Sequence, residues 1–520
     1  MNEHASRSGV RLSELLATLS LGTDLGLGQP MEHVLRQCLI ALRLGECLGL
    51  DEAERRVIYY SGLLAWVGCF TDAHEQAKWF GDDIAFKADS FAMEGGPVGY
   101  LLGHLGLGQP WTERVRLGVA FLGEGRRAVI SMLENHYLAT DELAARLGLG
   151  DDVRASLKQT FERWDGNHTP LGLKGEQILL TSRLIHLANL VEVFHRNGGV
   201  AAAVVAARER SGSEFDPVLV TLFCDQASAL CGDLDAATHW GAVIAAEPSL
   251  GAMISDEQFE GVLEAFADFV DLKSPYTISH SRGVADLVAA AARAYGLPED
   301  EVTTLRRAAL VHDFGRLGVS NGVWDKRGAL TQAEMERVRL HPYLSERMLS
   351  FSPVLAPLGA IAVQHHERLD GSGYPRGLAG DAITPAGRLL GAADMYHAKT
   401  EQRPHRAALS PEEAAAALRA EVAAGRLDGK AVDAVLRAAG HRVRRRQEWP
   451  AGLTAREVEV LRLVTYGLSN REIAQRLTIT SKTAGNHVEH VYMKIGASNR
   501  ARAALFAMKH GLMSDLQLPA

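Results

Sequence analysis

Histidines and aspartates able to bind metal ions are concentrated between residues 280 and 394 of the chain. The set is His280, His312, Asp313, His341, His365, His366 and Asp394. Neutral imidazoles together with carboxylates suit iron, manganese, zinc or nickel rather than calcium. Two such cations about 3.5 to 4 Å apart acidify a water molecule and hold the oxygens of a phosphoryl group. A carboxylate such as that of Asp313 can bridge the two ions, so the set predicts a two-metal hydrolytic site.

Short motifs surround these candidate ligands. They are SPYTISHS (274–281), HDFGRLGV (312–319), LHP (340–342), HHERLDGSGYPRGLAG (365–380), AADMY (392–396) and RPHR (403–406). With these motifs, residues from about 255 to 440 resemble the HD-GYP family of cyclic di-GMP phosphodiesterases, a branch of the HD phosphohydrolases.

The resemblance implies roles for individual residues. One metal would be held by His280, His312, Asp313 and Asp394, and the other by Asp313, His341, His365 and His366. Both would be divalent, with iron or manganese favoured over zinc or nickel. Tyr374, Arg403 and Arg406 would contact the guanine and phosphate of cyclic di-GMP, because an arginine fork binds phosphate or stacks on a base. A second carboxylate, Glu367, is expected to orient a metal-binding imidazole through its free N–H.

Three positions depart from the family pattern. Arg316 stands where the family usually has a lysine next to the scissile phosphate, and we expect it to act with Asp313 in catalysis. Tyr276 replaces a glutamate that binds a third metal in some members, and His397 replaces the usual acid after AD-x-Y/F. Two other functions stay open: a ligand-sensing transcription factor with little catalysis, and a general HD phosphohydrolase.

An internal repeat extends the pattern to the first half of the chain. Residues 161–189 align without gaps with residues 366–394, and His33 precedes Ala65 by the same interval that separates His280 from His312. The offsets differ, which places about 42 extra residues in the first copy, near 91–152. We therefore predict two copies of one fold.

The first copy has lost most of its ligands. In it, His312, Asp313, His365, His366 and Asp394 become Ala65, Trp66, Thr160, Phe161 and Asn189. Such a site cannot hold two metals, and bulky Trp66 and Phe161 would fill the space. We expect a scaffold or dimerisation half, with a sensory pocket around Asn189, His168 and Arg163 as the alternative.

The C-terminal segment contains two capping boxes, Thr454 with Glu457 and Ser469 with Glu472, which mark helix starts. A third helix opens at Thr480 or Ser481. Through LTAREVEVL and SNREIAQRL, residues 450–512 resemble the LuxR/FixJ-type helix-turn-helix. The expected DNA-contacting side chains are Lys482, Thr483, Asn486, His487, His490 and Lys494. A protein-docking bundle is the alternative, and half-site recognition would make the chain a homodimer.

The charge distribution agrees with DNA binding at this end. The 520 residues carry a net charge of -8, but from His441 onward Lys and Arg exceed Asp and Glu by seven. The sequence has no apolar run long enough to span a bilayer and no signal peptide, and its five cysteines form no CxxC pair. We expect a cytoplasmic protein without a membrane partner.

Helical periodicity dominates throughout, so an all-α fold is predicted. It would comprise two tandem HD-type helical domains, the first degenerate, and a small four-helix helix-turn-helix domain. The expected boundaries are 1–231 for the first domain, 232–256 for a connector, 257–440 for the metal phosphohydrolase domain, 441–452 for a basic linker and 453–515 for the DNA-binding domain.

Overall fold

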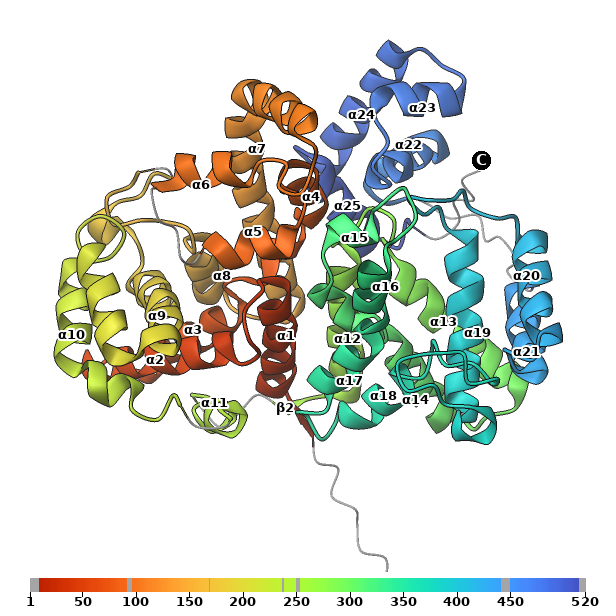
Figure 1. Cartoon of the computed structure of the whole chain (residues 1–520), viewed down its shortest axis with the longest axis horizontal. Coiled ribbons are helices and arrows are strands. Elements are labelled where there is room, and N and C mark those ends of the chain that lie inside the picture. The colour runs from red at the N-terminus through yellow and green to blue at the C-terminus, as the bar shows by residue number, and fades with distance from the viewer. Residues whose placement is uncertain are drawn as a thin grey trace, which may run out of the picture. The chain divides into compact units, whose positions relative to one another are not determined.

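The computed structural model describes residues 9–90, 96–167, 169–235, 238–248, 253–440 and 449–513. Helices form nearly all of the regular structure in these residues, which confirms the all-α prediction (Figure 1). The chain divides into two compact units. Unit 1 comprises residues 1–69 and 79–262, and unit 2 comprises 70–78 and 263–520.

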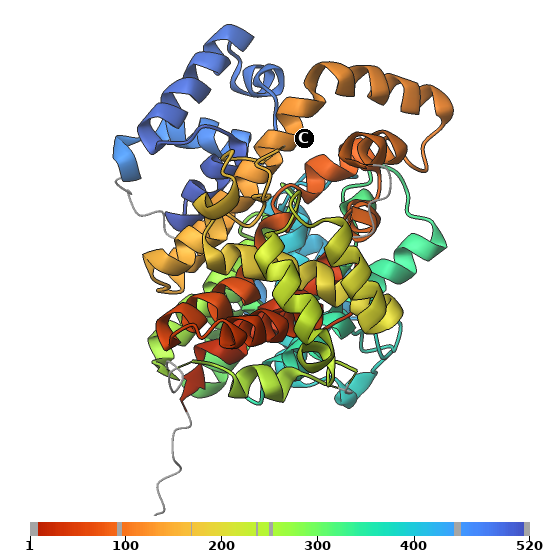
Figure 2. The same ribbon diagram turned by 90° about the vertical axis from the view of Figure 1, so that its left-hand side faces the viewer.

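Unit 1 contains the first copy. Its elements are β1 (Val10–Arg11), α1 (Leu12–Gly26), α2 (His33–Cys47), α3 (Glu52–Leu64), η1 (Val67–Phe70), α5 (Asp83–Ser90), α6 (Gly96–His104), α7 (Trp111–Arg146), α8 (Asp151–Lys158), η2 (Gly175–Gln177), α9 (Leu180–Glu209), α10 (Pro217–Cys231), α11 (Trp240–Ala245) and β2 (Met253–Ile254). Helices α2 and α9 pack side by side (Figures 1 and 2). The boundaries between the units fall within η1, within α4 (Ala73–Phe80) and within α12 (Asp256–Asp271).

Unit 2 contains the second copy and the C-terminal domain. The second copy consists of most of α12, α13 (His280–Tyr295), α14 (Glu299–Leu310), η3 (Phe314–Gly318), α15 (Asn321–Trp324), α16 (Gln332–Arg339), α17 (His341–Leu349), α18 (Ala356–Ala362), η4 (Gly380–Ala382), α19 (Pro385–Thr400), α20 (Pro411–Ala423) and α21 (Gly429–Gly440). Helix α13 packs against α14, α19 and α21. The first residue of α13 is thereby placed beside the middle of α19.

The C-terminal domain follows as η5 (Pro450–Gly452), α22 (Ala455–Thr465), α23 (Asn470–Leu477), α24 (Ser481–Ile495) and α25 (Arg500–Lys509). Both predicted capping boxes are formed, at Thr454 with Glu457 and at Ser469 with Glu472. Thr480 caps α24 by accepting a hydrogen bond from the Thr483 amide. Four α-helices around one apolar core confirm the predicted domain class.

Hydrogen bonds common to the two copies agree with the predicted duplication. The Glu162 carboxylate accepts hydrogen bonds from the amides of Leu171 and Leu173. Its counterpart Glu367 accepts them from the corresponding amides, of Arg376 and Leu378. In addition, the residue before His33 and the residue before His280 both have a left-handed backbone, with φ of 73° at Glu32 and 64° at Ser279.

The extra residues of the first copy lie earlier than expected. Helix α8 aligns with α18 at the 205-residue offset, so residues near 136–152 belong to the shared fold. The insertion therefore falls mainly in α5, α6 and the N-terminal part of α7.

The predicted connector is partly folded as well. It contains α11 and β2, which pairs antiparallel with β1, and the Val243 carbonyl accepts a hydrogen bond from the Tyr59 hydroxyl. Of the predicted basic linker, residues 441–448 lie outside the described residues.

Candidate metal centre

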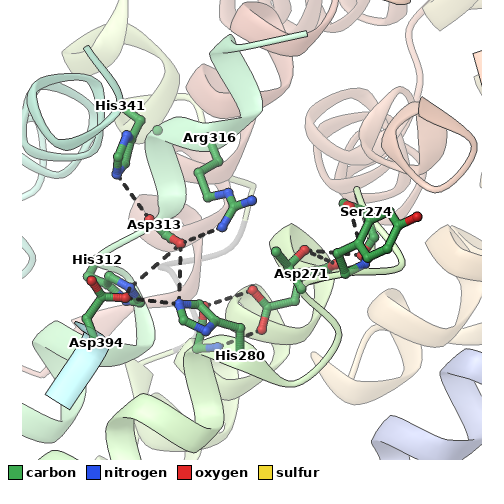
Figure 3. Close-up of polar contacts among 12 residues, drawn as sticks. Asp271, Ser274, His280, His312, Asp313, Arg316, His341 and Asp394 are labelled. Atoms are coloured by element: carbon green, nitrogen blue, oxygen red, sulfur yellow. Dashed lines mark hydrogen bonds and ion pairs between the residues drawn. The ribbon is translucent and has the colours of Figure 1, made fainter. Parts of the chain in front are cut away.

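The seven predicted metal ligands converge in unit 2 from five parts of the fold. His280 opens α13, His312 and Asp313 follow α14, His341 opens α17, His365 and His366 follow α18, and Asp394 lies within α19. All except His366 are buried. The convergence is visible for His280, His312, Asp313, His341 and Asp394 in Figure 3.

Asp313 lies at the middle of this cluster, between two groups of imidazoles (Figure 3). Its Oδ1 is 3.3 Å from His341 Nε2 and 3.8 Å from His365 Nε2. Its Oδ2 is 3.7 Å from both His280 Nε2 and His312 Nε2. Asp394 adds a second carboxylate, 3.3 Å from His280 Nε2. Asp313 is therefore oriented as a bridging ligand would be.

A glycine makes the approach of Asp313 to His341 sterically feasible. A Cβ at Gly315 would lie 2.0 Å from the His341 carbonyl oxygen, so only glycine lets η3 pack this closely on α17. The same contact recurs in the first copy, where a Cβ at Gly68 would lie 2.3 Å from the His136 carbonyl oxygen. The glycine of the HD-x-G motif thus positions the ligands without contacting them.

Backbone carbonyls orient three of the imidazoles. The Nδ1 atoms of His312, His341 and His365 each lie 2.6 Å from the carbonyl oxygen three residues earlier, in Ala309, Val338 and Ala362. A carbonyl can only accept, so each Nδ1 donates its proton, and in the neutral imidazole each Nε2 presents a lone pair to the cluster. The expectation that Glu367 orients an imidazole was wrong, because its carboxylate is occupied by the amides of the loop that follows it.

The arrangement fits bound metal ions. His312 Nε2 is buried and makes no hydrogen bond among the described residues. The Nε2 atoms of His341 and His365 lie 3.2 Å apart, with lone pairs facing each other. Such a donor set is satisfied by cations that bind several nitrogens and carboxylate oxygens together.

The electrostatics of the site keep His365 and Asp313 in the forms that bind metal. Burial and the neighbouring His312 and His341 lower the pKa of His365 to about 3, so this imidazole is neutral. Burial alone would raise the pKa of Asp313, but His312, Arg316 and His341 outweigh it and hold that pKa well below its usual range. Neutral imidazoles and ionised carboxylates are the states required of metal ligands.

A cavity of about 260 Å³ opens beside the cluster and is lined by Tyr374, Arg403 and Arg406, the three predicted substrate contacts. The Tyr374 ring lies 4.7 Å from the His366 ring. Arg403 donates to Glu401, whereas Arg406 donates to several backbone carbonyls and so braces the loop. Arg316 donates to Asp313 Oδ2 at 2.9 Å and lies 4.1 Å over the Trp324 ring.

In the C-terminal domain, α24 exposes one polar face. Lys482, Asn486 and His490 are exposed at intervals of four residues, with Thr483 and His487 partly exposed between them. The Lys494 ammonium group, further along the helix, donates to the Gly452 carbonyl and the Glu457 carboxylate within the domain. The face available to a ligand therefore lies at the N-terminal end of α24.

Comparisons with known proteins give results for both parts of unit 2. Residues 264–431 match the family described as HD domain, and residues 451–507 match bacterial regulatory proteins of the luxR family. The chain is 33% identical over 413 residues to 3'3'-cGAMP-specific phosphodiesterase 3 of Vibrio cholerae, covering 78% of this chain and 90% of the relative. This chain belongs to the HD-GYP phosphodiesterase family.

Two further similarities support membership of the HD-GYP family. The crystal structure of a cyclic GMP-AMP specific phosphodiesterase of V. cholerae superposes with a TM-score of 0.59 at 28% identity, over 84% of this chain and 99% of that one. The cyclic di-GMP phosphodiesterase response regulator RpfG of Xanthomonas campestris is 36% identical, but over only 35% of this chain and 48% of its own length. A match over 413 residues is longer than the second copy and C-terminal domain together, so the V. cholerae relative matches part of the first copy too.

In the first HD-GYP-like copy, side chains occupy the place of the metals. Trp66, at the position of Asp313, donates to Gln37 Oε1 at 2.6 Å, and its ring lies 5.9 Å from Phe161. His136, the counterpart of His341, has its Nε2 2.9 Å from the Ala65 carbonyl oxygen. Among the described residues, every cluster of three or more histidine, cysteine or acidic side chains that could hold a metal lies in unit 2.

The polar residues proposed for a sensory pocket in this copy are engaged internally. Asn189 Oδ1 lies 3.1 Å from His33 Nε2, and Arg163 is within 3.6 Å of the Glu214 carboxylate. His168 lies outside the described residues. These contacts favour a structural role for the first copy.

One residue of the HD-GYP site was missed from the sequence. Glu401 Oε2 lies 2.9 Å from His280 Nδ1. Burial lowers the pKa of His280, but Glu401 and Asp394 outweigh it and raise that pKa to about 10.

Among the described residues, no helix is long and apolar enough to cross a membrane.

Proposed function

We propose that this chain hydrolyses a guanine-containing cyclic dinucleotide in its HD-GYP domain and binds promoter DNA as a dimer through its C-terminal domain. The observation that carries the catalytic half is the placement of Asp313, whose two oxygens face two separate imidazole groups. Membership of the HD-GYP family supports the same reaction class.

In this proposal His280, His312, Asp313 and Asp394 hold one divalent ion, and Asp313, His341, His365 and His366 hold the other. Iron and manganese suit the mixed nitrogen and oxygen donor set. When bound, the two cations would lower the pKa of a water molecule and neutralise charge on the phosphoryl oxygens. The products are a linear dinucleotide or mononucleotides.

The protein's own side chains orient the substrate. The cavity of about 260 Å³ is smaller than the roughly 300–1,000 Å³ of typical ligand pockets, so we expect one half of the dinucleotide to enter it. The Tyr374 ring beside His366 offers a stacking surface for a guanine. Arg316, held over Trp324, places a positive charge next to the bridging carboxylate, where the scissile phosphate would bind.

Substrate identity is decided by comparing two dinucleotides. The sequence motifs resemble those of cyclic di-GMP phosphodiesterases, whereas the V. cholerae relative with 33% identity is specific for 3'3'-cGAMP. Both substrates contain guanine, so a stacking contact at Tyr374 serves either one. We propose cyclic di-GMP as the substrate, with 3'3'-cGAMP as the alternative substrate.

The test is turnover of both dinucleotides by anaerobically purified protein, for wild type and Asp313→Asn. We expect wild-type cleavage and a loss of at least about 100-fold in the variant, because an aspartate that positions both cations is removed. Asp433→Asn, which removes an exposed carboxylate on α21, is the matched control and should behave as wild type. Wild-type protein that binds two metals and cleaves neither dinucleotide would contradict the proposal and favour a ligand sensor.

A further inference from the structure

A carboxylate holds the outer nitrogen of His280, on the side away from the cluster. His280 Nε2 faces Asp394 and Asp313, while Nδ1 lies 2.9 Å from Glu401 Oε2. His280 is 1% exposed and Glu401 14% exposed, so this contact is shielded from water. The other three oriented imidazoles use a backbone carbonyl, and His280, as the first residue of α13, uses Glu401 instead.

The first copy contains the same interaction with a different residue. There His33 Nδ1 bonds to the Glu192 carboxylate. At the 205-residue offset Glu192 corresponds to His397, the position where this chain departs from the family's usual acid. The position of Glu401 is occupied in the first copy by Arg196, which pairs with Glu192 at 3.3 Å. The second copy therefore keeps the carboxylate on its histidine but supplies it from four residues later.

A third position changes together with these two. In the first copy Arg36 donates to Glu192 at 2.6 Å. Its counterpart in the second copy is Gly283, where a Cβ would lie 1.9 Å from His397 Nε2. A side chain at 283 would clash with the His397 ring, so the glycine accommodates the histidine. The pairing cation is supplied instead by Arg403, which donates to Glu401 Oε2 at 2.7 Å.

His280, His397 and Glu401 also lie close enough together to hold a metal of their own. Two contacts argue against that use. The Arg403 guanidinium already occupies the Glu401 oxygen that faces His280, and a cation there repels a metal ion. His280 Nε2 faces the carboxylates of the main cluster, so Nδ1 is left to donate its proton to Glu401.

We propose that Glu401 is a positioning residue that orients His280 toward the metals, and that His397 and Gly283 accompany the shift of this carboxylate by one helical turn. A carboxylate on the far nitrogen of a metal-binding imidazole fixes its tautomer and increases its basicity. The inference rests on the proposed function, since it assigns His280 as a metal ligand. It also gives His397 a structural explanation.

The test is binding of Mn²⁺ to the metal-free full-length chain, measured by equilibrium dialysis, together with dinucleotide turnover. Glu401→Ala should weaken Mn²⁺ binding at one of two sites by about 10- to 100-fold. The double variant His397→Glu/Glu401→Ala, which places the carboxylate at the position where the first copy has it, should recover most of this loss. Glu336→Ala removes an exposed helical carboxylate and should match wild type.

Rescue by the double variant distinguishes a loss of positioning from general structural damage. The double variant carries more substitutions than the single one, so general damage would not improve its Mn²⁺ binding. Circular dichroism should show the same helix content for all variants. The inference is overturned if Glu401→Ala binds Mn²⁺ as tightly as wild type, or if the double variant binds no better than the single one. Wild type that binds two Mn²⁺ ions without cleaving a dinucleotide refutes the proposed function alone, since the Mn²⁺ comparison still tests Glu401.

Discussion

At the scale of single residues, Asp313 and its neighbours set the chemistry of the site. Each oxygen of Asp313 faces a different group of imidazoles, and Arg316 donates to one of those oxygens. Three imidazoles are locked by backbone carbonyls and a fourth by Glu401. Ligands held in this way need little reorganisation when a cation binds.

Arg316 provides a residue-scale prediction. Arg316→Lys keeps a positive charge beside Asp313, so we expect turnover to stay within about 10-fold of wild type, whereas Arg316→Ala should lower it by about 100-fold. Steady-state kinetics on the preferred dinucleotide measures both. Equal turnover by Arg316→Ala and wild type would show that this charge has no part in the reaction.

The convergence of the seven candidate ligands could be predicted because they lie in short, recognisable motifs. Glu401 could not, because its relation to His280 becomes apparent only when α13 and α19 are packed together. The sequence did contain a clue. In the first copy Glu192 and Arg196 are a carboxylate and a cation four residues apart, whereas in the second copy the carboxylate stands at the later of the two aligned positions. Glu367 was misassigned because its partners are amides of the loop 9 and 11 residues later.

At the scale of elements, helix termini place the functional groups. His280 and His341 are the first residues of α13 and α17, and Asp394 lies on α19 beside α13. In the C-terminal domain, capping at Thr454, Ser469 and Thr480 fixes where α22, α23 and α24 begin. These caps were predictable, because they depend on side chains three residues apart. The intramolecular pair of Lys494 with Glu457 was not, because 37 residues separate them.

Gly485 provides an element-scale prediction. It lies within α24, where glycine costs about 1 kcal/mol relative to alanine. A Cβ there would meet Asn470 Nδ2 at 3.5 Å, an ordinary contact. Gly485→Ala should therefore slow amide hydrogen exchange in α24 by about 5-fold. Faster exchange in the variant would mean that the extra methyl group disturbs the packing of α24 on α23.

At the scale of the whole molecule, one fold occurs twice with different contents. The second copy brings seven candidate metal-binding side chains together, and the first fills the same space with Trp66, Phe161 and His136. Duplication was visible in the sequence because the loop carrying Glu162 and Glu367 kept its length. The exact position of the insertion was not, because α5, α6 and the N-terminal part of α7 have no counterpart to align with.

The proposed DNA-binding and catalytic functions lie in different domains, so we expect variants that weaken one function and leave the other unchanged. Asn486→Ala should weaken binding to a duplex selected by the wild-type chain by about 5- to 150-fold. Lys482→Ala should reduce the slope of the logarithm of the binding constant against the logarithm of salt concentration by about one. Turnover should not change in either. Arg437→Ala, an exposed charge on α21, is the control, and equal losses for all three variants would contradict a specific role for α24.

The most direct test of the account is to locate bound metals by anomalous diffraction from crystals grown anaerobically with Mn²⁺. We predict two ions per chain, one on each side of the Asp313 carboxylate, and none in the first copy. A single ion, ions that do not contact Asp313, or an ion beside Trp66 would contradict the claim that one copy holds a two-metal site and the other does not.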